Sequence, residues 1–96
     1  MLQLIKVRGN SIAPYLQDGD FAVILKSRWV HKPLKCGDYI VFHQSQFGTL
    51  IKRIHQIQPD GSLMVRGSDD FSTDSRFFGA VALEQVKGKV IWCIRQ

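Results

Sequence analysis

Ser11 occupies a position in which a serine side chain could act as a nucleophile. The apolar run of residues 2–7 predicts a strand, and Gly9 after it tolerates backbone angles that other residues avoid. Pro14 suits the first turn of a helix, so Ser11 lies where a strand ends and a short helical turn begins. Backbone N–H groups at such a turn have no partner within the helix and can bind a developing oxyanion. The alternative interpretation is that Ser11 only caps the turn.

Lys52 is the residue that could activate such a serine. It lies in the apolar stretch of residues 49–57, which predicts a strand whose side chains alternate between two faces. One face then holds Leu50, Lys52, Ile54 and Gln56. If that face points inward, removal from water disfavours the charged form of Lys52, and a neutral amine can act as a general base. The alternative is an edge-strand lysine with a solvated head, a role for which Arg53 on the opposite face is the better candidate.

The polar stretch of residues 67–79 is a third candidate for chemistry. Within it, Asp74 and Arg76 can form an ion pair that pins the loop, and Ser72 can hydrogen-bond a neighbouring amine. The spacing of Asp70, Ser72 and Asp74 is also that of a calcium loop. That interpretation fails because Ser75 stands where the turn glycine belongs and no acid follows at the twelfth position. The alternative is a solvated acidic turn.

The elements that would position these residues are short strands. Apolar runs predict six of them, at residues 2–7, 21–25, 39–42, 49–57, 62–65 and 88–94. Two similar Gly-Asp turns precede the second and third runs and predict neighbouring strands in one β system, and residues 59–61 predict a hairpin. With few helical signals, the sequence predicts an all-β, barrel-like domain.

Composition favours a small globular protein. The chain has 96 residues, 45% of them hydrophobic, which predicts one domain over residues 1–96. Its net charge of +5 comes from scattered residues without a nucleic-acid-binding pattern, so no nucleic acid is expected as a partner. No run is long enough for a membrane span, and the first residues are too weakly apolar for a secretion signal, so we expect a soluble, cytoplasmic protein. Cys36 and Cys93 are then expected as free, buried thiols.

Together these stretches resemble one family, the signal peptidase and LexA-type serine peptidases. GNSIAPYLQDGD resembles its nucleophile box, KCGDYIVF the strand that follows, LIKRI the segment with the general-base lysine, and GSDDFSTDSRFFG the box that ends in serine-x-aspartate-serine-arginine. The resemblance runs from Val7 to Gly79, and residues 88–90 fit the closing strand. Within the family, the short form is similar to the nickel-type superoxide dismutase maturation proteases, which remove a leader from the dismutase precursor.

The resemblance implies a partly open β-barrel and a role for each matched residue. Ser11 matches the nucleophile, Lys52 the general base, and Ser72 the serine that orients the lysine. Asp74 and Arg76 match the structural ion pair beside the site. The oxyanion would be bound by backbone N–H groups of Ser11 and Ile12, and no metal or cofactor is required. The implied partner is a protein or peptide substrate held as an extended strand.

The sequence departs from the family pattern at three places. Ile12 replaces the usual methionine, and Gly9 stands where some signal peptidases have a serine that assists the oxyanion hole. Ser68 and Asp69 replace an aspartate-asparagine pair, and the loop to Ser72 is a residue shorter.

Other functions stay open at this point. A LexA-type self-cleavage would occur before a glycine, as at Cys36-Gly37, and a non-catalytic module could use the same fold to bind peptides. Other processing proteases of the signal peptidase kind are a further alternative. Metal binding is weakly indicated, because the candidate ligands match no short zinc spacing. Those ligands are His31, Cys36, His43, His55 and Cys93. A histidine-based triad is disfavoured because His55 lies on the face opposite Lys52.

Overall fold

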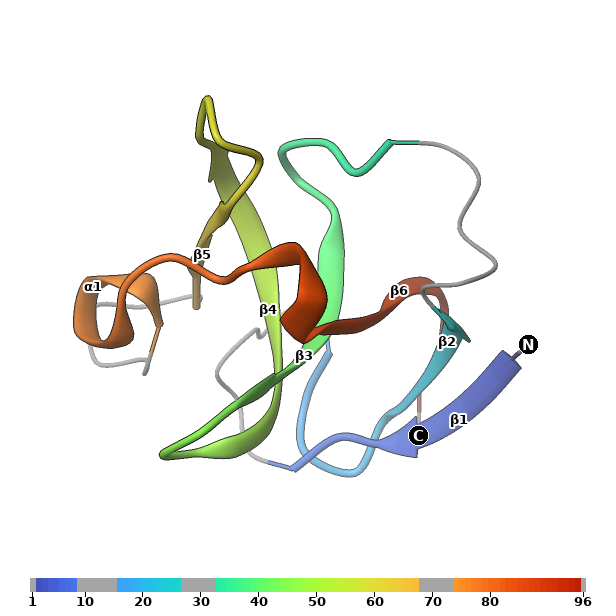
Figure 1. Ribbon diagram of the computed structural model, residues 1–96. Coiled ribbons are helices and arrows are strands. Elements are labelled where there is room, and N and C mark those ends of the chain that lie inside the picture. The colour runs from blue at the N-terminus through green and yellow to red at the C-terminus, as the bar shows by residue number, and fades with distance from the viewer. Residues whose placement is uncertain (1, 9–15, 27–32, 68–73, 96) are drawn as a thin grey trace.

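The computed structural model describes residues 2–8, 16–26, 33–67 and 74–95 of the chain. This part is mainly β, and its six strands form one antiparallel sheet (Figure 1). Two short helices, α1 and η2, follow the fifth strand. In chain order the elements are β1 (Leu2–Lys6), β2 (Phe21–Lys26), β3 (Tyr39–Gln44), β4 (Gly48–Ile57), β5 (Leu63–Arg66), α1 (Ser75–Phe78), η2 (Leu83–Gln85) and β6 (Val86–Ile94).

All the predicted strands are present, and the predicted hairpin joins β4 to β5. The hairpin turn is closed by Gln58, whose N–H donates to the carbonyl of Ser62 at 2.9 Å. β6 begins at Val86, before the predicted Gly88, because Val86 pairs with Phe42 and buries its side chain. The strand order is β1-β2-β6-β3-β4-β5, so β1 and β5 form the two edges of the described sheet.

The prediction that the strands after the two Gly-Asp turns are neighbours is wrong, because β6 lies between β2 and β3. Gly88 allows this insertion. A Cβ at this position would lie 2.5 Å from Cγ2 of Ile24 and 2.6 Å from the carbonyl oxygen of Leu25. β6 can therefore approach β2 closely while its other edge pairs with β3.

β3 separates two hydrophobic clusters, because its side chains alternate between them. Val41 points into the first cluster, and Ile40 and Phe42 point into the second. The first cluster contains Val7, Leu16, Ala22, Ile24, Val41 and Val90. The second contains Ile40, Phe42, Ile54, Leu63, Val65, Val81 and Val86. The first cluster thus holds the chain on both sides of residues 9–15, and the second lies under β4 and β5.

The sheet face formed by β1, β2 and β6 on the side away from the first cluster is apolar and exposed. Register places Leu4, Val23 and Trp92 side by side across it, and Trp92 is 66% exposed. No helix in the described ranges combines the length and the apolar character needed to cross a bilayer.

Candidate functional site

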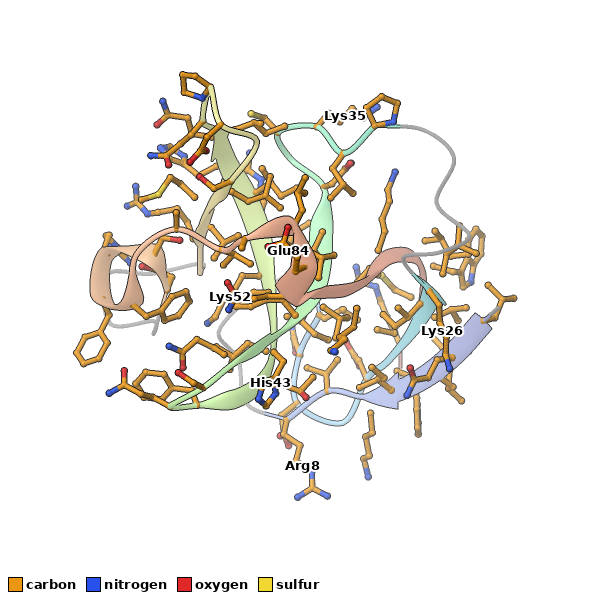
Figure 2. All side chains as sticks on the ribbon, in the orientation of Figure 1. Arg8, Lys26, Lys35, His43, Lys52 and Glu84 are labelled. Carbon is orange, nitrogen blue, oxygen red and sulfur yellow. The ribbon has the colours of Figure 1, made fainter. Side chains whose placement is uncertain are left out.

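Lys52 lies in the interior of the fold, as Figure 2 shows. Its exposed fraction is 2%, and the neighbours at the same face of β4 are Leu50 and the fully buried Ile54. Across the strand pair it lies opposite Ile40, which is also fully buried. The condition stated for Lys52, that its face of the strand points inward, is therefore met. Lys52 is thus a buried lysine flanked by aliphatic residues on its own strand and on β3.

Strand alternation correctly placed Arg53 but not Gln56. Arg53 is exposed on the opposite face, where the ordinary role of a solvated cation was expected. Gln56 is exposed too, although it was predicted to share the face of Lys52. The register between β4 and β5 shifts between Ile54 and Gln56, so His55 is an extra residue that ends the regular alternation.

The register of β5 brings Gly67, the first residue of the polar stretch 67–79, close to Lys52. Arg66, the last residue of β5, lies opposite Arg53, so the chain leaves β5 one position from Lys52 on β4. The N–H of Gly67 donates to Oδ2 of Asp74 at 3.0 Å. Gly67 and Asp74 are therefore held together at the end of β5. Ser72 itself lies outside the described residues.

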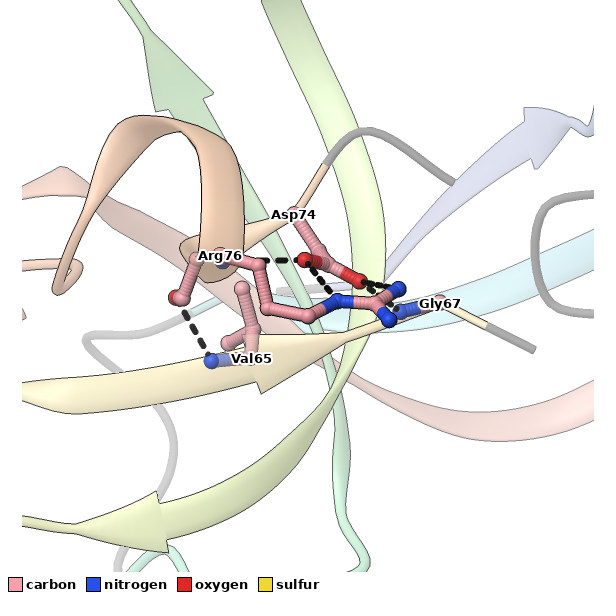
Figure 3. A network of polar contacts seen from close by, with 5 residues as sticks. Val65, Gly67, Asp74 and Arg76 are labelled. Atoms are coloured by element: carbon pink, nitrogen blue, oxygen red, sulfur yellow. Dashed lines mark hydrogen bonds and ion pairs between the residues drawn. The ribbon is translucent and has the colours of Figure 1, made fainter. Parts of the chain in front are cut away.

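Asp74 fixes this place through the ion pair that the sequence predicted (Figure 3). Nη2 of Arg76 donates to Oδ2 at 2.8 Å, and Nε donates to Oδ1 at 3.0 Å. The backbone N–H of Arg76 also donates to Oδ1 at 3.0 Å, so Asp74 is the N-cap of α1. The Asp74 side chain is fully buried, whereas that of Arg76 is 35% exposed. The aspartate thus joins the end of β5 to the start of α1.

The same contacts determine the charge state of Asp74. Burial by itself raises the pKa of Asp74, but hydrogen bonds from the Arg76 side chain and from the backbone of Gly67 and Arg76 outweigh it. The pKa is lowered from its ordinary value of 3.8 to about 2. Asp74 is therefore an anion at neutral pH, as its structural role requires.

Ser75 is a residue that the sequence analysis did not single out. Its buried Oγ accepts a hydrogen bond from the N–H of Val65 at 2.8 Å, which ties α1 to β5 (Figure 3). On the other side, the ring of Phe78 packs against Phe42 and Phe47. A serine that directly follows a possible helix cap was the signal in the sequence that could have pointed to Ser75. The sequence does not show, however, which distant N–H donates to its hydroxyl. α1 is therefore held in place from two sides, by the hydrogen bond of Ser75 and by the ring contacts of Phe78.

Ser11 and Ile12 lie outside the described residues, and the chain on either side of them packs into the first hydrophobic cluster. Val7 and Leu16 both belong to the first hydrophobic cluster, with exposed fractions of 6% and 0%. The N–H of Val7 donates to the carbonyl of Asp20 at 2.7 Å, and the N–H of Gly19 donates to the carbonyl of Val7 at 2.9 Å. The described residues on both sides of the segment with the predicted nucleophile thus lie at the first cluster.

A groove connects this cluster with the strand of Lys52. One cavity of about 240 Å³ lies between residues 5–8 at the end of β1 and residues 49–51 of β4, directly before Lys52. A second cavity of about 240 Å³ shares Ile5 and Thr49 with the first and continues toward the ends of β2 and β6. We call the two cavities together the β1–β4 groove. The sequence did not predict it, because it forms between segments far apart in the chain.

Two backbone edges face the β1–β4 groove. Val7 bonds toward residues 19 and 20, so the alternation of a strand directs the backbone groups of Lys6 and Arg8 to the other side. On β4, Ile54 bonds toward β3, which directs the backbone groups of Thr49 and Ile51 away from β3. Within the described residues, β5 pairs only with β4 residues from Arg53 onward, which leaves that edge open before Lys52. The groove can therefore accept an added strand.

The cysteines are free, as predicted, but the expected burial is wrong. Cys36 is exposed in a turn, and Cys93 is half-buried at the end of β6, where it pairs with Ala22 of β2 beyond the residues that pair with β3. Among the described residues, no three His, Cys, Asp or Glu side chains lie close enough together to hold a metal ion. His31 lies outside the described residues, and His43 and His55 are exposed.

The Cys36-Gly37 bond, considered above for self-cleavage, lies in an ordered turn. The N–H of Gly37 donates to the carbonyl of Ile54 at 2.9 Å, and Gly37 has a φ of 96° that favours glycine. The Asp38 carboxylate accepts the N–H of Lys35 at 3.0 Å. Cleavage here would require the turn to detach from β4.

The comparisons with known proteins add no relative. No protein-family model and no curated protein matches the chain.

Proposed function

We propose that the protein is a serine endopeptidase with a Ser-Lys dyad, on a partly open β-barrel of the LexA and signal peptidase kind. Ser11 is the nucleophile and Lys52 the general base. The substrate is a protein precursor from which a leader is removed, with the precursor of nickel-type superoxide dismutase as the first candidate. The observation that carries the proposal is the burial of Lys52 to 2% among aliphatic side chains, directly beyond an open strand edge.

The burial of Lys52 suits the chemistry that a dyad requires. Burial disfavours the charged form of an amine, and only the neutral form can accept a proton. In the proposed reaction, Lys52 takes the proton of the Ser11 hydroxyl while Ser11 attacks the substrate carbonyl. Lys52 then gives that proton to the leaving amine, and water releases the acyl-enzyme. Ser72 orients the lysine in this proposal.

The oxyanion formed in the attack would be bound by the backbone N–H groups of Ser11 and Ile12. Such a donor typically contributes about 2.7–4 kcal/mol to the stability of the transition state. The ion pair of Asp74 and Arg76 takes no part in the reaction in this proposal. Its task is to hold both ends of residues 68–73 beside β4.

The β1–β4 groove supports a peptide as the substrate. An extended peptide added to the open edges would exchange backbone hydrogen bonds with residues 6 and 8 on one side and 49 and 51 on the other. Its path would lead past the residue before Lys52 and toward the segment of Ser11. This geometry suits a peptide bond better than a small-molecule ester, because backbone pairing needs an extended chain.

The test is cleavage of the dismutase precursor, read by mass spectrometry, with wild-type protein and two active-site variants. Ser11→Ala and Lys52→Met should abolish a single cut at the leader boundary, and Lys52→Met keeps the volume of the buried side chain. Arg53→Met is the matched control, since it changes the exposed neighbour on the same strand. Cleavage that persists in both active-site variants would refute the dyad. An intact precursor with wild type would refute this substrate.

A further inference from the structure

The far end of the β1–β4 groove carries two lysines. Lys26 ends β2 and pairs with Gly88 of β6, so it lies beside Lys87. Both side chains are exposed, and both line the second cavity together with Gln3 and Thr49. In the part of the chain that the structure describes, neither has an ion-pair partner. Two lysines therefore line one cavity of about 240 Å³, with no acidic residue among its described lining residues.

The other end of the groove has the same sign of charge. Lys6 and Arg8 line the first cavity, where the chain leaves β1 toward Ser11. Among the described residues that line the two cavities, four are cationic and none is acidic. Low-dielectric walls with one sign of charge concentrate the field in a cleft and attract ligands of the opposite charge. The groove therefore favours an anionic occupant along its whole length.

The distance between the ends gives the register of that occupant. From Arg8 back to Gln3 the strand advances by about 17 Å at 3.3 Å per residue. We consider a peptide that pairs with β1 and has its reacting bond near Arg8, where the chain leads to Ser11. The side chain of this peptide that reaches Lys26 and Lys87 is then about five residues from the reacting bond.

From these charges and this spacing we infer that the β1–β4 groove selects an extended peptide with an acidic side chain about five residues from the reacting bond. Lys26 and Lys87 bind that carboxylate, and Lys6 and Arg8 contribute to attraction over the rest of the groove. The inference deepens the proposed function and rests on it for the position of the cut. The acidic preference itself concerns binding and can be measured without cleavage.

The binding arm of the test uses the Ser11→Ala protein, so that no probe is consumed. The probes are two labelled peptides of about ten alternating valines and threonines, one with an aspartate near each end and one with asparagines there. Fluorescence anisotropy should give about three- to tenfold tighter binding of the aspartate peptide, as expected for two exposed ion pairs. The difference should shrink as NaCl is raised. It should disappear with Lys26→Gln and Lys87→Gln together, and persist in the control Lys35→Gln, which lies outside the groove.

The cleavage arm digests a proteome-derived peptide library with wild-type protein and with the Lys26→Gln, Lys87→Gln variant. Acidic residues about five positions from the cut should be enriched with wild type and lost with the variant. Equal binding of the two probes, or cuts without this enrichment, would overturn the inference. An uncut library together with preferred binding of the aspartate probe would instead refute the proposed function and support the acidic groove.

Discussion

Asp74 is expected to make the stability of the protein depend on pH in the acid range. In the folded state its pKa is about 2, compared with an ordinary value of 3.8, because hydrogen bonds from Arg76 and Gly67 outweigh the effect of burial. At about 1.4 kcal/mol for each pH unit, this difference corresponds to about 2 kcal/mol of folding free energy. Because the folded pKa is lowered, this stabilisation is fully present above pH 4 and is lost as the pH falls through 2.

The assay is urea unfolding followed by far-UV circular dichroism, for wild type and Asp74→Asn between pH 7 and pH 2. Asparagine can still cap α1 through its carbonyl oxygen. Its NH2 group, however, is a donor and cannot accept the hydrogen bonds that Gly67 and Arg76 donate to Oδ2 of Asp74. The variant should be less stable than wild type at pH 7, and the gap should narrow by about 2 kcal/mol by pH 2. Glu84→Gln is the control, because it removes one exposed carboxylate of the same charge.

The result at low pH decides whether this reasoning is right. A gap between wild type and Asp74→Asn that has the same size at pH 7 and pH 2 would refute it. The stability of Asp74→Asn would then reflect packing alone, and the ion pair would not hold the ends of residues 68–73.

Two further substitutions test the packing around the site. Gly88→Ala should lower the free energy of unfolding by about 1–3 kcal/mol in urea titrations, because the new Cβ would overlap Ile24 and the carbonyl of Leu25; unchanged stability would show that β6 and β2 can separate freely. Ser75→Ala should cost about 1–3 kcal/mol, because it leaves the N–H of Val65 buried without an acceptor, whereas Ser62→Ala in the half-exposed hairpin turn should cost less. Equal effects of the two serine substitutions would contradict the role of Ser75.

The strands could be predicted from the sequence because each is marked by a short apolar run between turn residues. The inward position of Lys52 could be predicted as well, since aliphatic residues two positions away on either side identify its face. These patterns are local, so the strands and the faces of their regular parts followed from the residues alone, whereas α1 and η2 were not predicted.

What could not be predicted depends on contacts between distant segments. The insertion of β6 between β2 and β3 requires the close approach at Gly88, which no local pattern reveals. A single shift of register between β4 and β5 after Ile54 leaves Gln56 exposed. Cys93 is only half-buried because it lies near the end of β6. The β1–β4 groove is likewise a product of the way the sheet curves, since its two sides are about forty residues apart in the chain.

Lys52 is the residue at which a role in the fold and a role in chemistry can be separated. Burial of an amine costs free energy of folding that burial of an apolar side chain does not. The other described lysines are exposed or half-buried, and a small domain has little core to spare for an amine. A methionine of similar volume fills the same space, so Lys52→Met should stay folded while it loses cleavage. Retained or increased stability together with loss of cleavage would mean that the lysine is kept for chemistry. A variant that loses both would mean that Lys52 supports the fold itself, and the general base would have to be sought elsewhere.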